Sequence, residues 1–275
     1  MQIGCALMGG TFMPEFKSGA HIVETPFERI FSGYRKAVGM GYDYVEASAS
    51  ELLALSKDEL NALVEKKDKG EFALRYVNSF VRGDLKICVE KQETLEKYAR
   101  EVISRAHMLG AGVVVFGSGA ARMRPDSMTH EQGIKKLSDF IVMCKNISKE
   151  YGIKISLEPL NSAETNIINK VSQGAELVRR LDSPEIVLLA DAFHMAIEGE
   201  SASVIIENED IISHIHVSEA PGRVYPGKYG GEYLIKLGKE LKESKFDKDI
   251  TVECCFDDFE KEGIKALRFV KEKML

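Results

Sequence analysis

Short apolar runs alternate along the chain with longer stretches in which apolar residues recur every three or four positions. The short runs are nearly continuous and rich in β-branched residues, as expected of strands that are covered on both faces. They lie at positions 3–8, 44–47, 74–77, 113–116, 153–157, 186–190, 212–217 and 250–252. This alternation is typical of βα units on a parallel sheet.

The longer stretches predict amphipathic helices between the strands. Each carries a single apolar stripe with a period near 3.6 residues, as a helix packed on a sheet should. The stripes lie within 27–37, 95–109, 134–151, 234–241 and 264–270, and we expect Ile264 on the buried side of the last one. Ser56 and Glu59 have the spacing of a capping box, which predicts a helix that begins at this point.

Eight such repeats in 275 residues leave about 34 residues for each, close to what a (β/α)8 barrel uses. The predicted fold class is therefore α/β, a single (β/α)8 TIM barrel domain over residues 1–275. An open doubly wound sheet is the alternative, but the G-x-G-x-x-G turn that usually follows its first strand is missing. No linker rich in Pro or Ser indicates a second domain.

Composition and charge exclude several partners. The chain has 37 basic and 43 acidic residues, a formal net charge of −6 and no run of more than two Lys or Arg, so we expect no nucleic-acid partner. No segment approaches the roughly 18 apolar residues of a membrane span, so we expect no membrane association. Five cysteines without framework spacing suit free thiols in the cytoplasm, and the apolar start is interpreted as a strand, not a signal peptide.

Residues that can bind metal ions or transfer protons follow the last four predicted strands. Glu158, Asp191 and Glu253 end three of these strands, and His216 lies near the end of the fourth, 25 to 37 residues from its neighbours. In a barrel of this type the carboxyl ends of the strands form one rim, so the four side chains are expected to converge there. Any one acidic residue at a strand end is equally well explained as a helix cap, but four in register are not.

Three converging carboxylates would repel one another unless a cation lies among them. Oxygen ligands with one imidazole favour a single divalent ion such as Mn²⁺, Mg²⁺ or Co²⁺, with Zn²⁺ also compatible. The metal ligands predicted are therefore Glu158, Asp191, His216 and Glu253.

The sequence around these residues resembles a known family. The segments LEPLNSAETN at 157–166, DAFH at 191–194, HIHVSE at 214–219 and TVE at 251–253 are similar to motifs of the xylose isomerase-like sugar epimerases, in particular the ketose 3-epimerases of the D-tagatose and D-psicose type. The resemblance is specific from Leu157 to Glu253 and generic before it. It implies a sugar substrate, a divalent cation, and a homo-oligomer, a dimer or a tetramer.

The resemblance also implies a role for each matching residue. Glu158 and Glu253 would bind the metal and act as an acid–base pair on opposite faces of the sugar, while His194 and Arg223 would bind the substrate near its carbonyl and Glu164 would hold a hydroxyl. Two features depart from the family pattern. The arginine follows the metal-binding histidine by seven residues where six are expected, and the residues after the first strand, 8–12, lack the expected aromatic side chains.

Such a site suits proton abstraction next to a carbonyl through an enediolate whose charge the metal stabilises. Two bases on opposite faces favour epimerisation, whereas return of the proton to the neighbouring carbon gives isomerisation.

A metal-dependent dehydratase of an inosose or dehydroshikimate type is the leading alternative. An endonuclease IV-like enzyme would need more histidines, and His21, His107, His130 and His214 are not expected to bind further zinc. A barrel that only binds sugar would not need both glutamates.

Two glycine-rich loops and two polar residues at strand ends are further candidates for the site. The glycines within 116–122 and 229–232 suit either a phosphate site or ordinary turns before helices, and turns that line the sugar pocket are favoured at the first position. Glu46 and Asn78 lie at the ends of the second and third strands and are candidates to point into the pocket, and Glu46 suits a helix cap equally well.

Overall fold

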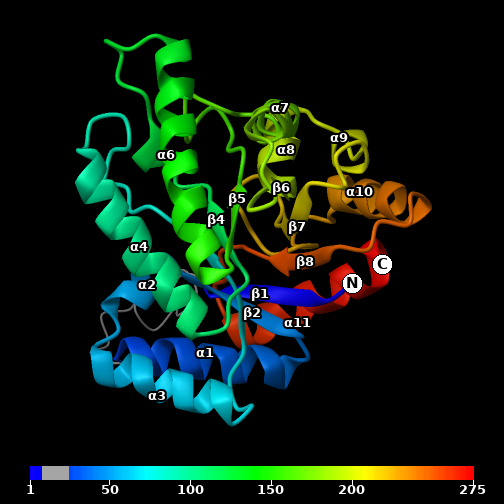
Figure 1. Cartoon of the computed structure of the whole chain (residues 1–275). Coiled ribbons are helices and arrows are strands. Elements are labelled where there is room, and N and C mark those ends of the chain that lie inside the picture. The colour runs from blue at the N-terminus through cyan, green and yellow to red at the C-terminus, as the bar shows by residue number, and fades with distance from the viewer. Residues whose placement is uncertain (8–24) are drawn as a thin grey trace.

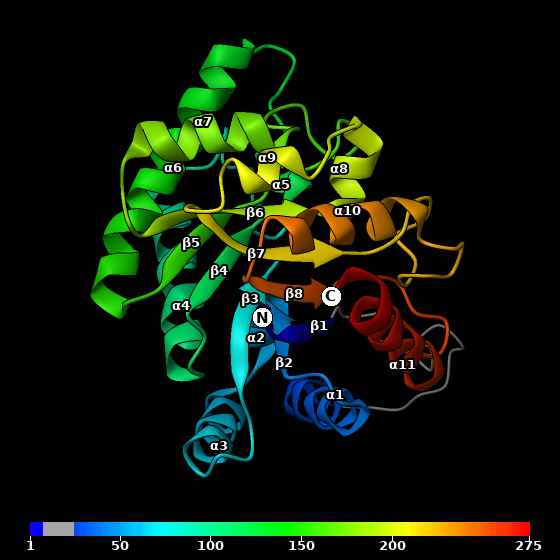
Figure 2. The same cartoon turned by 90° about the vertical axis from the view of Figure 1, so that its right-hand side faces the viewer.

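The computed structural model describes residues 1–7 and 25–275, and within them eight parallel strands close into a barrel in chain order, with β1 paired to β8 (Figures 1 and 2). The strands are β1 (Ile3–Leu7), β2 (Tyr44–Ser48), β3 (Leu74–Asn78), β4 (Val113–Phe116), β5 (Lys154–Leu157), β6 (Ile186–Asp191), β7 (Ile212–Val217) and β8 (Asp249–Val252). The predicted (β/α)8 barrel is confirmed, with every described strand boundary within one residue of its predicted position. Residues 8–12 and His21, which the sequence analysis singled out, lie outside the described residues.

Helices connect the strands and surround the barrel (Figures 1 and 2). They are α1 (Pro26–Met40), α2 (Ala49–Ala54), α3 (Lys57–Asp68), α4 (Gln92–Met108), α5 (Gly119–Arg122), α6 (His130–Tyr151), α7 (Val171–Leu181), α8 (Ala192–Glu198), α9 (Ser203–Ile206), α10 (Glu232–Glu243) and α11 (Phe259–Phe269), and a π-helical turn η2 (Val270–Met274) ends the chain. All five helices predicted from apolar stripes are present, as α1, α4, α6, α10 and α11.

Local sequence signals fix where several helices begin and end. The predicted capping box forms at α3, where Ser56 accepts from the Glu59 N–H and the Glu59 carboxylate accepts from the Ser56 N–H. Gly152 ends α6 in the left-handed conformation that favours glycine. One expectation for α11 is wrong, because Ile264 is 47% exposed and the helix instead packs through residues that include Gly263 and Leu267.

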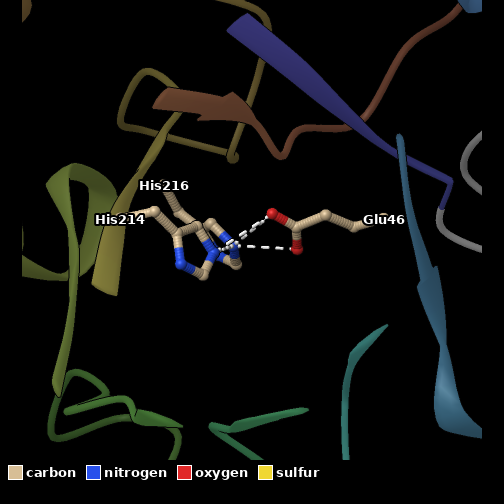
Figure 3. Close-up of side chains that lie close together, drawn as sticks. All are labelled: Glu46, His214 and His216. Carbon is tan, nitrogen blue, oxygen red and sulfur yellow. Dashed lines mark hydrogen bonds and ion pairs between the residues drawn. The ribbon is translucent and has the colours of Figure 1, made fainter. Parts of the chain in front are cut away.

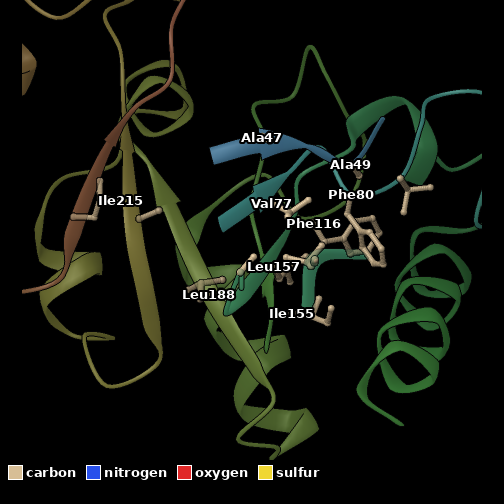
Figure 4. Packing of buried hydrophobic residues seen from close by; sticks show 14 of the residues in the cluster. Ala47, Ala49, Val77, Phe80, Phe116, Ile155, Leu157, Leu188 and Ile215 are labelled. Carbon is tan, nitrogen blue, oxygen red and sulfur yellow. The ribbon is translucent and has the colours of Figure 1, made fainter. Parts of the chain in front are cut away.

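The apolar core lies mainly between the strands and the helices. Phe80, Phe116 and Phe140 contact one another there, with ring centroids 5.1 to 5.9 Å apart, and join β4 to α6. Figure 4 shows Phe80 and Phe116 side by side in this core. Aromatic clusters of this kind stabilise the fold beyond their buried area. The core therefore holds the strand ends, and the residues on them, in fixed positions.

The interior of the barrel is polar over much of its length. Tyr44 from β2 forms a hydrogen bond with Thr251 from β8, and Tyr76 from β3 donates to Asp249 across the interior. Gly4 makes room for this arrangement, because a Cβ atom on it would lie 2.0 Å from the Tyr44 ring. Buried polar groups need partners, so this network constrains which side chains fit the barrel.

In the described ranges, 1–7 and 25–275, no helix is both long enough and apolar enough to cross a bilayer.

Candidate metal and sugar site

The four predicted metal ligands meet at the carboxyl end of the barrel. Glu158 follows β5, Asp191 ends β6, His216 lies near the end of β7, and Glu253 follows β8. All four are buried, and one ligand atom from each lies within 4.8 Å of the ligand atoms of the others. The convergence expected from their spacing is therefore present in the structure.

Donor atoms of the cluster face one another without forming hydrogen bonds. The His216 Nδ1 atom lies 2.7 Å from Glu253 Oε2 and 3.6 Å from Glu158 Oε1. Yet His216 Nδ1 and Glu158 Oε1 are both buried without a hydrogen-bond partner. The two carboxylate oxygens of Asp191 have different partners. Oδ1 accepts from the Phe193 N–H at the start of α8, and Oδ2 faces the site. The helix-cap and metal-ligand interpretations of Asp191 thus both fit.

Charge and burial shift the pKa values of these groups in opposite directions. Burial raises the pKa of Glu158, and the nearby Glu253 charge adds to this effect. For Glu253 burial acts in the same direction, but His216 and Arg223 outweigh it and hold its pKa well below the usual range. For His216 burial favours the neutral ring, but the Glu253 and Glu46 carboxylates raise its pKa well above 6.5. The site therefore has a strong electrostatic demand for positive charge.

A divalent cation meets that demand. The cluster offers three carboxylates and one imidazole nitrogen, a donor set that suits Mn²⁺, Mg²⁺, Co²⁺ or Zn²⁺. Buried donor atoms with no hydrogen-bond partner are costly, and coordination to an ion would satisfy them. The residues present fit a single metal ion.

Arg223 reaches the cluster from the turn after β7. Its Nη2 atom lies 2.6 Å from Asp191 Oδ2 and also donates to Glu253 Oε2, while Nη1 lies 3.2 Å from His194 Nε2. The spacing from His216 to this arginine is one residue longer than the family pattern. The turn between them is tight, because Gly222 and Arg223 both adopt positive φ, at 86° and 52°. Mutual backbone hydrogen bonds between Glu219 and Val224 close the turn. The departure in spacing thus leaves the guanidinium at the site.

His194 and Glu164 lie beside the cluster. The Asn161 N–H donates to His194 Nδ1 at 3.1 Å, and the Asn161 side-chain amide donates to Glu164 Oε1 at 3.1 Å. His194 is buried, whereas the side chain of Glu164 is 46% exposed. Glu164 therefore lies at the open edge of the site, and Asn161, which the sequence analysis did not single out, connects it to His194.

The two glycine-rich loops line the site or support it. In the loop after β4, a Cβ atom on Gly117 would lie 2.2 Å from Glu158 Oε2, so the absent side chain leaves room for this carboxylate. In the loop before α10, the N–H groups of Gly227, Tyr229 and Gly231 all donate to the Glu219 carboxylate, at 2.8 to 3.1 Å. These donors are already paired, so the second loop offers no phosphate site.

A second buried group lies below the metal cluster, and of its members beyond His216 the sequence predicted only Glu46 as a candidate for the pocket. Glu46, on β2, lies in the barrel interior against His214 and His216 and does not cap a helix, since Ser48 caps α2 (Figure 3). His214 was not expected to take part. The H-x-H spacing was the available signal, because residues two apart on a strand point to the same face. Asn78 also faces the site, with its amide 3.4 Å from Glu253 Oε1.

A family model described as "Xylose isomerase-like TIM barrel" matches residues 34–273 of the chain. Among characterised relatives, a 3-dehydro-D-guloside 4-epimerase of Escherichia coli (strain K12) is 24% identical over 200 residues, which cover 70% of this chain and 75% of that protein. A D-psicose 3-epimerase of Enterocloster bolteae is 23% identical over 236 residues, which cover 78% of this chain and 75% of that protein.

Solved structures share the fold over the whole chain. A D-psicose 3-epimerase from Clostridium cellulolyticum H10 superposes with a TM-score of 0.81 at 17% identity, covering 100% of this chain and 99% of that one. A 3-keto-D-glucoside 4-epimerase from E. coli gives a TM-score of 0.77 at 18% identity, covering 98% of this chain and 99% of that one.

Proposed function

This chain belongs to the xylose isomerase-like TIM barrel family, and we propose that it is a divalent-metal-dependent sugar epimerase that inverts a carbon next to a ketone. The observation that carries the proposal is the buried cluster of Glu158, Asp191, His216 and Glu253, whose donor atoms face one another without hydrogen-bond partners at His216 Nδ1 and Glu158 Oε1. A metal site with two glutamates provides both the charge and the bases that such a reaction needs.

The names of the relatives support this reaction class. A D-psicose 3-epimerase inverts the carbon beside the C2 ketone of a ketose, and a 3-dehydro-D-guloside 4-epimerase inverts the carbon beside a C3 ketone. Both reactions begin with removal of the proton from the carbon next to the ketone. Ketose 3-epimerisation is the activity we propose first, because most of the matched relatives carry names of this kind.

The residues of the chain would divide the chemistry as follows. A bound divalent ion supplies positive charge that stabilises the negative charge developing on the ketone oxygen. Glu253, whose pKa is held low, is suited to take the proton, and Glu158, whose pKa is raised, is suited to deliver one from the other side. The roles reverse in the opposite direction of the reaction.

The neighbouring side chains would bind and orient the sugar. Arg223 places positive charge and N–H donors beside the carboxylates, where an oxyanion would form, with His194 next to it, and one oxyanion contact of this kind is worth about 3 kcal/mol. Glu164 at the open edge would accept a hydrogen bond from a sugar hydroxyl. Glu158, Asp191, His216 and Glu253 would hold the ion, with Mn²⁺, Mg²⁺ and Co²⁺ preferred over Zn²⁺.

We further propose that the enzyme acts in the cytoplasm as a dimer or tetramer. All five cysteines are free, which suits a reducing compartment, and the oligomer is proposed by analogy with the family.

Hydrogen exchange in D₂O tests the proposal. The protein is incubated with D-psicose, D-tagatose, D-fructose, L-ribulose and a 3-keto-glucoside, with Mn²⁺ or with a chelator, and deuterium and product stereochemistry are followed by NMR. We expect deuterium at one carbon beside the ketone together with inversion of that carbon, only when metal is present.

The Glu253→Gln variant is the matched control, because it keeps the shape of the side chain and removes the base. We expect it to lose at least a thousandfold in kcat. Loss of water from a substrate without inversion would favour the dehydratase alternative. If no member of the panel exchanges deuterium with Mn²⁺ present, the epimerase assignment is wrong.

A further inference from the structure

We propose that Glu46 is a positioning residue that holds the His216 ring with Nε2–H toward the barrel interior and Nδ1 toward the metal ligands. The inference rests on the metal site of the proposed function and assigns a role to a residue outside the four ligands. It follows from the juxtaposition of one carboxylate with two imidazole rings, His214 and His216, beneath the cluster (Figure 3).

The contacts are direct and fully buried. Glu46 Oε2 lies 3.1 Å from His216 Nε2, and Glu46 Oε1 lies 3.1 Å from His214 Nε2. All three residues have no exposed surface. Figure 3 shows the carboxylate reaching from β2 toward both rings on β7, so it joins strands that are not neighbours in the barrel.

These contacts decide the tautomer of His216. An ionised carboxylate only accepts hydrogen bonds, so a ring nitrogen that faces it must carry a proton. Nδ1 of the same ring lies 2.7 Å from Glu253 Oε2 and 3.6 Å from Glu158 Oε1, so without a metal it carries a proton as well. When a cation takes the place of that proton, Nε2–H would stay on Glu46 and the lone pair of Nδ1 would face the ion. The second ring nitrogen of a metal-bound histidine is commonly held by a carboxylate in this way, which orients the ring and strengthens its bond to the metal.

Other residues hold Glu46 in place. The Thr251 hydroxyl donates to Glu46 Oε1, and Tyr44 forms a hydrogen bond with Thr251. His214 is fixed on its other side by Tyr76, whose ring stacks on it at 4.0 Å with an interplanar angle of 1°. The pairing of β2 with β3 shifts register between Val45 and Glu46, an irregularity of the kind that re-aims side chains next to functional sites.

The same three residues also satisfy the distance criterion for a metal site of their own. The hydrogen-bond partners of these atoms favour a positioning role for Glu46 over a second metal site. Both Glu46 oxygens and the Nε2 atoms of His214 and His216 have hydrogen-bond partners or close ion-pair contacts with one another, whereas His216 Nδ1 and Glu158 Oε1, in the cluster above, have no hydrogen-bond partner within the described residues. A second ion is therefore an outcome for the test to exclude.

Calorimetric titration of the metal-free protein with MnCl₂ tests the inference, because it measures how tightly the wild type and the Glu46→Gln variant bind Mn²⁺. Glu46→Gln keeps the size of the side chain but sets an amide N–H against one of the two imidazole N–H groups, so we expect Mn²⁺ to bind 10- to 100-fold more weakly. Tyr76→Phe is the matched control, because it keeps the ring on His214 and removes only the hydroxyl that bonds Asp249. We expect this variant to bind Mn²⁺ within about threefold of the wild type.

The outcomes separate this inference from the proposed function. Wild-type protein that binds no divalent ion overturns both. Wild-type protein that binds one ion while Glu46→Gln binds it equally well overturns the positioning role alone. A stoichiometry of two ions per chain, with the second lost in Glu46→Gln, also overturns it, because Glu46 would then be a ligand.

A measurement on the unaltered protein covers the case in which Glu46→Gln does not fold. In zinc-loaded protein with ¹⁵N-labelled histidine, we expect the His216 NMR signals of a ring protonated at Nε2 and coordinated through Nδ1. A ring protonated at Nδ1 or coordinated through Nε2 contradicts the inference, and a purely structural role for Glu46 predicts no such preference.

Discussion

At the scale of single residues, the site is a set of charges that the fold forces together. Burial and neighbouring carboxylates raise the pKa of Glu158, whereas His216 and Arg223 lower that of Glu253. The surroundings thus give the two glutamates different pKa values, although their side chains are identical. Such a difference is what the proposed acid–base pair needs. The charge that creates this difference would also attract a divalent cation.

Metal binding should release protons near pH 7. Glu253 and Glu46 overcome the effect of burial and raise the pKa of His216 well above 6.5, so the metal-free ring is protonated at neutral pH and must lose its Nδ1 proton to become a ligand. Affinity therefore rises with pH up to that pKa, by about tenfold per pH unit for each proton released. Calorimetry in two buffers of different ionisation enthalpy measures the proton count, and equal heats in both buffers would exclude the release.

Glu164 should affect substrate binding more than chemistry. Its side chain is 46% exposed and its carboxylate is held by the Asn161 amide, at the edge of the site and away from the reacting glutamates. We expect Glu164→Gln to raise KM at least fivefold and to leave kcat within about tenfold, because a hydrogen bond to a charged group is worth roughly 1.5–3 kcal/mol. Steady-state kinetics beside Glu253→Gln check this, and a reversed pattern, with kcat lost and KM unchanged, would contradict it.

The sequence predicted the residues at strand ends because their position follows from the strand boundaries alone. Glu158, Asp191, His216 and Glu253 each follow or end a clear apolar run, and parallel strands carry their ends to one rim. Contacts across the interior were not predictable in this way. Glu46 and His214 lie on β2 and β7, far apart in the sequence, and they meet only because the barrel closes. A local sequence pattern does not carry this information.

At the scale of elements, the strands place the site and the turns complete it. The turn after β7 brings Arg223 to the carboxylates, and Glu219 pins the following loop by accepting three backbone N–H groups. Helix positions followed from periodicity and capping, but the buried face of α11 did not. Ile264 is exposed because the buried face of the helix runs through Gly263, Ala266 and Leu267, and a Cβ atom on Gly263 would lie 3.1 Å from the Met40 sulfur.

Gly4 in β1 should be sensitive to even the smallest side chain. A Cβ atom there would overlap the Tyr44 ring, whose hydroxyl supports Thr251 beneath the site. We expect Gly4→Ala to lower the free energy of unfolding by about 1–3 kcal/mol, the cost of overpacking a core. Urea denaturation measures this change.

Gly39→Ala is the matched control in α1, where no atom lies within 4 Å of the added Cβ. We expect it to raise stability by about 0.5–1 kcal/mol, because alanine favours helix. Equal effects of the two substitutions would show that Tyr44 does not fill the space in front of Gly4.

At the scale of the whole molecule, stability and function are linked through the charge at the barrel mouth. The closed barrel buries Glu46, Glu158, Asp191 and Glu253 near one another, and a metal ion that binds only the folded state would offset their repulsion. The fold class was predictable from eight repeats of one period, since few architectures use that pattern.

A divalent ion should therefore raise the melting temperature. At a hundred times Kd the ion adds about 2.7 kcal/mol to the free energy of unfolding. We expect Mn²⁺ or Co²⁺ to raise Tm by several degrees and a chelator to reverse the shift, as followed by differential scanning fluorimetry. Identical melting curves with Mn²⁺, with Co²⁺ and with chelator would contradict a site of this kind.

The most direct measurement is anomalous diffraction from crystals of the protein loaded with Mn²⁺. The account predicts one strong peak per chain, within bonding distance of carboxylate oxygens of Glu158, Asp191 and Glu253 and of Nδ1 of His216. No peak at these residues, or a peak coordinated by a different set of side chains, would contradict it.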